Sequence, residues 1–469
     1  MNRKLLKNIS ITFFANIISM LVSMISTLVI PKLIGTTEYG YWQLYIFYIS
    51  YAGLLHLGLC DGVYLKYGGR EYSDLNFSSL RTEFWILSIY SMCFCGIISI
   101  IALLMKLDMN MRYIVWFTCF GAFVHVLRTY LWLILQTTNR LKEYSKIVIA
   151  DRIVFVVGIV VIALTVQTSF QGLIICDIIG RISSLLIAIF YTKEVVIGKL
   201  DFNKKVLSDV IEDISAGINL LIAGIASNFI IGFIRIGIQN NWNIETFGKV
   251  SLSLSVINMV LSFISVASIV FFPLLKRLEG KLQLELYKQM DIILNVCTFF
   301  ILLFAGIGSK LIEIWLPQYQ ESAFYLILLL PICVYESETA MLLNTYLKAF
   351  RLEKNLMWVN AIIMFLSMIF SYITTTCAKN LYMAIVGIDI LVLLRVIVLK
   401  YILRKRANCV SYKKVIFMEI VSLITYLVSY QVFNIFYAGL IYAVVYTMFV
   451  MINFKELKKI VINNIQIGT

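Results

Sequence analysis

Apolar stretches of 16 to 25 residues recur along the whole 469-residue chain, separated by short segments that carry most of the charge. A membrane-spanning helix needs roughly 20 apolar residues, whereas the strands of a membrane β-barrel alternate polar and apolar residues. We therefore predict an all-α polytopic membrane protein with about 14 transmembrane helices. The predicted spans are Ile9–Ile30, Tyr41–Cys60, Glu83–Met105, Tyr113–Leu135, Ile147–Leu164, Leu173–Tyr191, Ile214–Ile238, Val250–Phe272, Ile292–Ile307, Ala323–Tyr346, Leu356–Thr374, Tyr382–Leu403, Val415–Val432 and Tyr437–Phe454.

Composition excludes a soluble protein. Hydrophobic residues make up 61% of the chain and charged residues only 14%, against about 25% charged residues in an average soluble domain. The net charge of +14 could suggest nucleic-acid binding, but a chain buried in lipid cannot offer a continuous basic groove. We expect membrane lipids, and no nucleic acid, around this protein.

Basic residues fall mainly on one side of the predicted spans. If the N-terminus is cytoplasmic, the tails and loops on that side contain 29 Lys and Arg residues, and the opposite loops contain 6. Because an excess of Lys and Arg marks the cytoplasmic side, both termini are predicted to be cytoplasmic. Lys400, near the end of the predicted span Tyr382–Leu403, is counted with the 29 cytoplasmic residues. The other five basic residues lie within predicted helices: Arg128, Arg152, Arg181, Arg235 and Arg395.

Two short motifs recur at nearly equal offsets. Thr37–Gly40 resembles Glu245–Gly248 after 208 residues, and Arg140–Glu143 resembles Arg351–Lys354 after 211 residues. Six helices separate the copies, so the chain is predicted to contain two parallel six-helix repeats, 1–205 and 206–403. Residues 404–469 then form two extra helices and a cytoplasmic tail. In transporters built from repeats, the substrate site lies between the repeats.

Three segments carry a resemblance to a known family: Ile34–Gly40 (IGTTEYG), Leu57–Gly62 (LGLCDG) and Leu135–Tyr144 (LQTTNRLKEY). With these motifs and the predicted architecture, the chain resembles the polysaccharide flippases (Wzx type) of the multidrug/oligosaccharidyl-lipid/polysaccharide (MOP) exporter superfamily. The resemblance implies a MATE-like fold in a bacterial inner membrane. It also implies translocation of undecaprenyl-diphosphate-linked oligosaccharides for surface polysaccharides such as O-antigen. A polysaccharide polymerase and a chain-length regulator are candidate partners.

The arginines within the predicted helices are candidate ligands for a diphosphate. A charged residue at the centre of a spanning helix costs roughly 2.5–3.5 kcal/mol, so it needs a partner or a hydrated cavity. Guanidinium groups can bind phosphate oxygens bidentately. Arg152 could instead reach lipid headgroups at the cytoplasmic end of its helix. The predicted substrate-binding residues are therefore Arg128, Arg181, Arg235 and Arg395.

Other ionisable residues within the spans are candidates for coupling or gating. Asp177 and Arg181 are four apart on one helix face, so they either pair with each other or line a cavity. Asp389 follows Asp177 by 212 residues, and it is six residues from Arg395 and so diverges from it around the helix.

A third group connects the two halves. At the repeat offset of 211, His125 corresponds to Glu336, with Glu338 nearby, and Arg128 lies three residues after His125. These residues could form an ion-pair gate between the halves. The alternative is local neutralisation within each half. Pro331, just before Glu336, is predicted to kink its helix.

Two other functions are alternatives to flipping. A cation-coupled multidrug or metabolite exporter of the same superfamily usually has twelve helices and an acidic cavity. A polysaccharide polymerase or ligase usually has a long outer loop, whereas the loops predicted here are short. The chain contains no Gly-x4-Gly-Lys-Ser/Thr phosphate loop and only two histidines. We therefore expect no enzymatic activity, no catalytic residues, no cofactor and no metal site.

Overall fold

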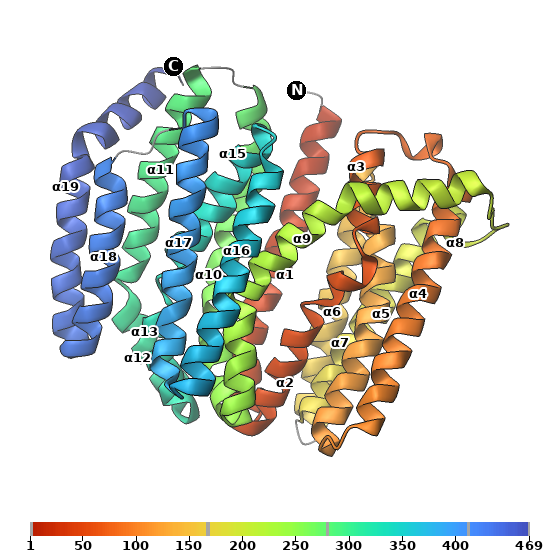
Figure 1. Cartoon of the computed structure of the whole chain (residues 1–469), viewed down its shortest axis with the longest axis horizontal. Coiled ribbons are helices and arrows are strands. Elements are labelled where there is room, and N and C mark those ends of the chain that lie inside the picture. The colour runs from red at the N-terminus through yellow and green to blue at the C-terminus, as the bar shows by residue number, and fades with distance from the viewer. Residues whose placement is uncertain (1–2, 166–168, 278–280, 410–412, 468–469) are drawn as a thin grey trace. The chain divides into compact units, whose positions relative to one another are not determined.

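The predicted all-α membrane fold is confirmed. The computed structural model describes residues 3–165, 169–277, 281–409 and 413–467, and these residues form helices and connecting loops without a strand (Figure 1). Among them, 11 helices are long and apolar enough to cross a membrane, and the number rises to 14 if each of three bent helix pairs counts as one span. The upper number equals the predicted count.

The contacts divide the chain into two compact units. Unit 1 contains Met1–Ile225 and Ile244–Gly248, and unit 2 contains Ala226–Asn243 and Lys249–Thr469. The division falls within α9 (Lys204–Asn241), whereas the repeats predict a boundary after residue 205. Because α9 is one continuous helix, no loop separates the units there. The predicted third segment, 404–469, belongs to unit 2.

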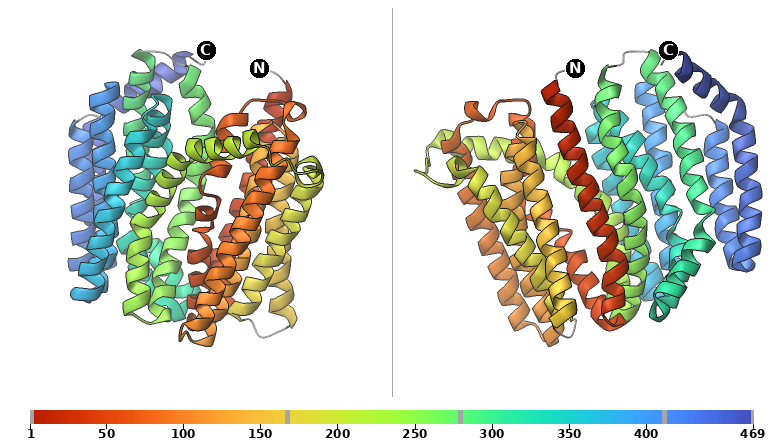
Figure 2. Two further views of the ribbon diagram at one scale, coloured as in Figure 1. Left: turned by 45° about the vertical axis from the view of Figure 1, so that its right-hand side comes forward. Right: turned by 180° about the vertical axis from the view of Figure 1, so that it is seen from behind.

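Unit 1 is a bundle in which α4, α5, α6 and α7 run side by side (Figure 1) and α1 packs along α6 (Figure 2). Its elements before α9 are α1 (Arg3–Leu33), α2 (Thr36–Ile49), η1 (Ala52–His56), α3 (Leu59–Tyr67), η2 (Tyr72–Asp74), α4 (Phe77–Leu104), α5 (Met109–Thr137), α6 (Leu141–Thr165), α7 (Phe170–Tyr191) and α8 (Lys193–Val196).

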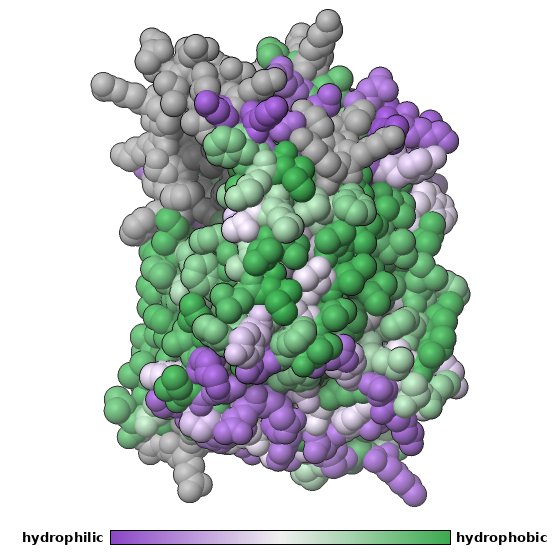
Figure 3. Space-filling model, turned by 90° about the vertical axis from the view of Figure 1, so that its left-hand side faces the viewer, coloured by the Kyte–Doolittle hydropathy of each residue, from purple (hydrophilic) through white to green (hydrophobic). Residues whose placement is uncertain are grey.

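In unit 2, a hairpin of α18 and α19 packs on α11, and α17 packs on α13, α14 and α16. Figure 3 shows the face that carries α18 and α19, where apolar side chains form a broad band with hydrophilic residues at both ends. Unit 2 contains most of α10 (Ile244–Arg277), followed by α11 (Lys281–Leu302), α12 (Ala305–Trp315), η3 (Pro317–Tyr319), α13 (Gln320–Leu329), α14 (Ile332–Glu338), the π-helical turn η4 (Thr339–Leu343), α15 (Asn344–Ala349), α16 (Glu353–Ser371), the π-helical turn η5 (Tyr372–Cys377), α17 (Leu381–Ala407), α18 (Lys413–Val432) and α19 (Ile435–Ile467).

The second predicted span, Tyr41–Cys60, is a broken helix rather than a continuous one. Elements α2, η1 and α3 bend by 60°. The break falls at Leu57 and Gly58, which both adopt left-handed backbone conformations with φ of 49° and 92°. The ring nitrogen Nδ1 of His56 accepts a hydrogen bond from the Gly58 N–H at 3.2 Å. This local bond satisfies one backbone donor that the broken helix leaves free.

The predicted kink at Pro331 is confirmed, since the segments on either side of it bend by 48°. Proline has no N–H and cannot donate to the carbonyl four residues earlier, which is that of Ile327. The Tyr426 hydroxyl of α18 donates to this carbonyl at 2.9 Å. The extra hairpin therefore supplies the hydrogen bond that the proline removes.

Glycines allow two close helix crossings in unit 1. A Cβ at Gly62 of α3 would lie 1.8 Å from the backbone oxygen of Asp213 of α9, so the two backbones touch. At the other crossing, the repeated motif meets its own copy. A Cβ at Gly248 would lie 2.8 Å from the Cα of Gly40, and the Thr37 hydroxyl donates to the Glu245 carboxylate at 2.6 Å.

Candidate functional site

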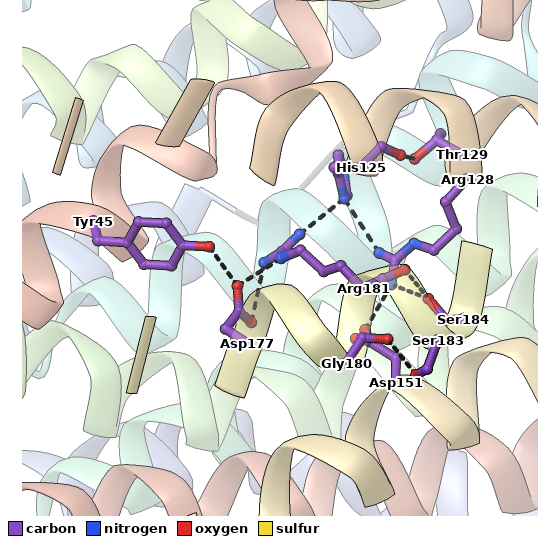
Figure 4. A network of polar contacts seen from close by, with 10 residues as sticks. All are labelled: Tyr45, His125, Arg128, Thr129, Asp151, Asp177, Gly180, Arg181, Ser183 and Ser184. Atoms are coloured by element: carbon purple, nitrogen blue, oxygen red, sulfur yellow. Dashed lines mark hydrogen bonds and ion pairs between the residues drawn. The ribbon is translucent and has the colours of Figure 1, made fainter. Parts of the chain in front are cut away.

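Helices α5, α6 and α7 bring a network of buried charges together within unit 1 (Figure 4). Arg128 of α5 forms an ion pair with Asp151 of α6, with 2.7 Å between Nη1 and Oδ2. The same Nη1 donates to the Ser184 hydroxyl of α7 at 3.1 Å. The guanidinium also lies 5.3 Å from the centre of the Trp132 ring. Arg128 is thus held by groups from three helices rather than by an anion on its own helix.

The second ion pair of the network is the predicted pair within α7. Arg181 Nε lies 2.6 Å from Asp177 Oδ2, and the hydroxyl of Tyr45 from α2 donates to the same oxygen at 2.6 Å. Both side chains are nearly buried, with 13% of Arg181 and 10% of Asp177 exposed. The pair neutralises its own charge, and Tyr45 also ties it to a second helix (Figure 4).

His125 joins the two arginines. Its Nδ1 lies 3.2 Å from Arg128 Nη2 and 3.1 Å from Arg181 Nη1. Arginine can only donate hydrogen bonds, so Nδ1 must accept them and the ring proton lies on Nε2. A neutral His125 therefore holds two cationic groups beside each other, and their mutual repulsion favours an anion at this position.

The network carries an excess of basic groups. Arg128 and Arg181 are balanced by Asp151 and Asp177, and half-buried Arg152 interacts electrostatically with both Arg128 and Asp177. Arg128 Nε is buried without a hydrogen-bond partner among the described residues. The network can therefore bind an anion if that anion competes with the aspartates for the guanidinium donors.

A second set of predicted residues meets within unit 2. Arg395 of α17 is fully buried and pairs with Glu336 of α14, with 2.6 Å between Nη2 and Oε1. Its Nη1 donates to the Ser227 hydroxyl of α9 at 2.8 Å. The ion pairs found in the structure, Arg128 with Asp151 and Arg395 with Glu336, are those of local neutralisation. The ion-pair gate between His125 and Arg128 of one half and the acids Glu336 and Glu338 of the other stays a prediction.

Two further predicted residues lie at separate positions. Asp389 of α17 is fully buried, and neither of its carboxylate oxygens has a hydrogen-bond partner among the described residues. Within the described part of α17, Asp389 forms no ion pair with Arg395, in agreement with their spacing of six residues. Arg235 of α9 is half-buried and donates to the Ser251 hydroxyl of α10 at 2.9 Å.

Sequence reasoning missed a four-residue cluster around Lys400, which we call the Lys400 cluster. Lys400 Nζ lies 3.2 Å from Asp291 Oδ1 of α11, 2.5 Å from Glu338 Oε1 of α14 and 2.5 Å from Glu419 Oε1 of α18. Only Glu338 was predicted. The prediction that Lys400 is a cytoplasmic loop cation is wrong. The residue lies within α17, almost fully buried, and the acids that bury it come from three other helices.

Comparison with solved structures identifies the fold. Neither a protein-family model nor a curated protein sequence matches the chain. A structure of the lipid II flippase MurJ in an inward closed conformation superposes with a TM-score of 0.69 at 12% identity, over 96% of this chain and 99% of that one.

Two transporters of the MOP superfamily superpose as well. An inward-facing multidrug resistance MATE family transporter has a TM-score of 0.64 at 13% identity, over 82% of this chain and 98% of that one. A MOP superfamily transporter from Pyrococcus furiosus has a TM-score of 0.54 at 15% identity, over 86% of this chain and 96% of that one. The chain is thus a polytopic membrane protein with a MATE-like fold, which it shares with these three structures.

Proposed function

We propose that this protein translocates undecaprenyl-diphosphate-linked oligosaccharide repeat units across the bacterial inner membrane by alternating access. The translocated repeat units serve surface polysaccharide synthesis. Both termini of the protein lie in the cytoplasm in this proposal. A polymerase and a chain-length regulator are the proposed partners downstream. The similarity to the lipid II flippase structure and to the MATE transporter structures supports a transporter of this fold.

The observation that carries the proposal is the pair of buried guanidinium groups in unit 1. Arg128 and Arg181 both donate to one histidine nitrogen, and each is held by a single aspartate. A diphosphate offers several acceptor oxygens and can take the place of the two carboxylates. Charge-assisted hydrogen bonds of this kind are worth about 1.5–3 kcal/mol each, and more where water is excluded.

A cation exporter of the same fold is the second candidate. Its support is the acids of unit 2, since organic cations bind to carboxylates. The acids of the Lys400 cluster, however, already contact an ammonium group. In unit 1 the described network has more arginines than aspartates. The charges therefore favour an anionic substrate.

A membrane-bound polymerase or ligase has less support. The connections between spanning helices in the described part of the chain are short, and the stretch between α8 and α9 comprises only residues 197–203. None offers the long loop in which such an enzyme would hold its reacting groups. We therefore propose transport without catalysis.

The proposal is tested by deleting the gene and analysing lipid-linked intermediates. We expect undecaprenyl-diphosphate repeat units to accumulate on the cytoplasmic leaflet and surface polysaccharide to be lost. Wild-type protein and Arg70→Gln, a change at an exposed arginine, should restore the polysaccharide. Arg181→Gln should reduce it about 10- to 100-fold, the effect of losing one charge-assisted bond.

Two outcomes would overturn the proposal. One is normal surface polysaccharide in the deletion strain together with new drug sensitivity, which would favour the exporter. The other is full complementation by Arg181→Gln at wild-type protein levels, which would show that the guanidinium network does not bind the substrate.

A further inference from the structure

The Lys400 cluster has an unbalanced charge. Asp291, Glu338 and Glu419 would contribute −3 and Lys400 would contribute +1, which leaves −2 if all four groups are ionised. The side chains are almost completely buried, with exposed fractions between 0% and 3%. Burying uncompensated carboxylates costs several kcal/mol per charge. Two further positive charges must therefore be present in this state.

A metal ion is a poor candidate for these charges. One oxygen from each of the three acids lies within 4.8 Å of the others, which is a spacing that a cation could use. Lys400 Nζ, however, is itself 2.5 to 3.2 Å from all three acids. An ammonium group has three N–H donors, so it already serves as the cation that the three carboxylates share.

Unsatisfied acceptors within the cluster indicate protons instead. Asn295, which is 1% exposed, places its amide nitrogen 3.5 Å from Asp291 Oδ1. Three acceptor oxygens have no hydrogen-bond partner among the described residues: Oδ1 of Asn295, Oδ2 of Asp291 and Oε2 of Glu419. A protonated carboxyl group would supply the donor that such an acceptor lacks. Protons therefore account for both the charge and the missing donors.

A second unpartnered group borders the cluster. Tyr335 of α14 is fully buried, its hydroxyl has no hydrogen-bond partner among the described residues, and it interacts electrostatically with Glu419, Asp389 and Glu338. Asp389 lies 11 residues before Lys400 on α17, about 16 Å along the axis. The titratable and charged groups around the cluster are Tyr287 and Asp291 on α11, Tyr335, Glu336 and Glu338 on α14, Asp389, Arg395 and Lys400 on α17, Glu419 and Tyr426 on α18, and Tyr442 on α19.

We propose that the Lys400 cluster is a proton-binding site, in which Asp291, Glu338 and Glu419 share two protons beside a charged Lys400. The acids come from α11, α14 and α18, and Lys400 of α17 contacts all three, so loss of a proton leaves uncompensated charge and favours movement of these helices apart or entry of water. This inference deepens the proposed function. Only its last part rests on that function, namely that the protons exchanged at the Lys400 cluster drive translocation.

The experiment uses infrared spectroscopy of the purified full-length protein in lipid nanodiscs at neutral pH. Protonated carboxyl groups have a C=O stretch that ionised carboxylates lack. We expect Glu419→Gln to reduce this band by one carboxyl group, because two acids and one ammonium need only one proton. Lys400→Met should increase it by one, because three acids without the ammonium need three protons.

Two further variants serve as controls. Glu285→Gln, at an exposed residue on the same helix as Asp291, should leave the band unchanged. Lys400→Met combined with Glu419→Gln should give the wild-type intensity, because two protonated acids then remain in a neutral site. This double variant keeps the test available if the single lysine change fails to fold.

The proposal is overturned if Lys400→Met does not increase the band, or if the wild-type band appears only after sodium and magnesium are removed. The latter result would show that a metal ion fills the site. The spectra need no transport substrate, so their failure would leave the proposed flippase activity untouched. Conversely, failure of the Arg181 complementation test would not change the spectra.

Discussion

The ion pair between Arg128 and Asp151 should contribute strongly to stability, because it is both short and buried. At 2.7 Å and an effective dielectric constant of about 20, the attraction between the charges is about 6 kcal/mol before the cost of desolvation. Removing one partner of a buried pair typically costs about 3–5 kcal/mol, since the other charge stays buried alone. We expect Arg128→Met and Asp151→Asn each to lose about this much.

The double variant should cost little more than either single change, because it leaves no unpaired charge. The free energy of unfolding of the purified protein, measured by reversible denaturation in mixed micelles, gives the coupling energy of the pair. The control cycle combines Lys310→Met with Glu313→Gln. That pair is equally short, at 2.6 Å, but its side chains are 60% and 32% exposed, so its coupling should be about 0.2–1 kcal/mol.

A coupling energy at Arg128 and Asp151 no larger than in the control cycle would refute this reasoning, because burial would then add nothing to the pair. The double variant also separates stability from function. It should fold nearly as well as either single variant, and it should fail to restore surface polysaccharide, since it lacks one of the two proposed phosphate ligands.

Two predictions concern contacts between helices. Gly62→Ala should lower the free energy of unfolding by about 1–3 kcal/mol through overpacking against Asp213. The control Gly96→Ala, with no atom within 4 Å of the added Cβ, should be neutral or stabilising by up to about 1 kcal/mol. Equal effects of the two changes would show that the α3 and α9 backbones are not in contact. Tyr426→Phe should cost about 1–3 kcal/mol by leaving a buried carbonyl unsatisfied. Tyr426→Phe should cost clearly less in a Pro331→Ala background, where the new backbone N–H of residue 331 can donate to the same carbonyl. An unchanged cost in that background would contradict the claim that the Tyr426 hydroxyl replaces the N–H that proline lacks.

The helices could be predicted from the sequence because their apolar length is a local property. The same holds for the kink at Pro331 and for the pair of Asp177 and Arg181, whose spacing of four residues fixes a common helix face. The break at Leu57 and Gly58 does not follow from the sequence pattern, because it lies within a stretch that is mostly apolar over the length of a span. Its cause is a left-handed turn that hydropathy does not register.

Partners on different helices could not be predicted in this way. Asp151 is the partner of Arg128 because α5 and α6 are each oriented about their own axis so that these two side chains face each other, and tertiary packing sets this orientation. Lys400 was placed in a loop because it is near the end of its predicted span, and basic residues at span ends usually face the cytoplasm. Its burial depends on Glu419, which belongs to a helix that follows later in the chain and packs back on the cluster.

The central claim is tested most directly by a flipping assay in proteoliposomes that contain only the purified protein and a fluorescent undecaprenyl-diphosphate-linked oligosaccharide. A membrane-impermeant quencher added outside reports how much of the lipid is in the outer leaflet. We predict that wild-type protein makes the lipid from the inner leaflet accessible to the quencher and that Arg181→Gln slows this about 10- to 100-fold. Flipping at the wild-type rate by Arg181→Gln, or none by wild-type protein that exports organic cations from the same vesicles, would contradict the account.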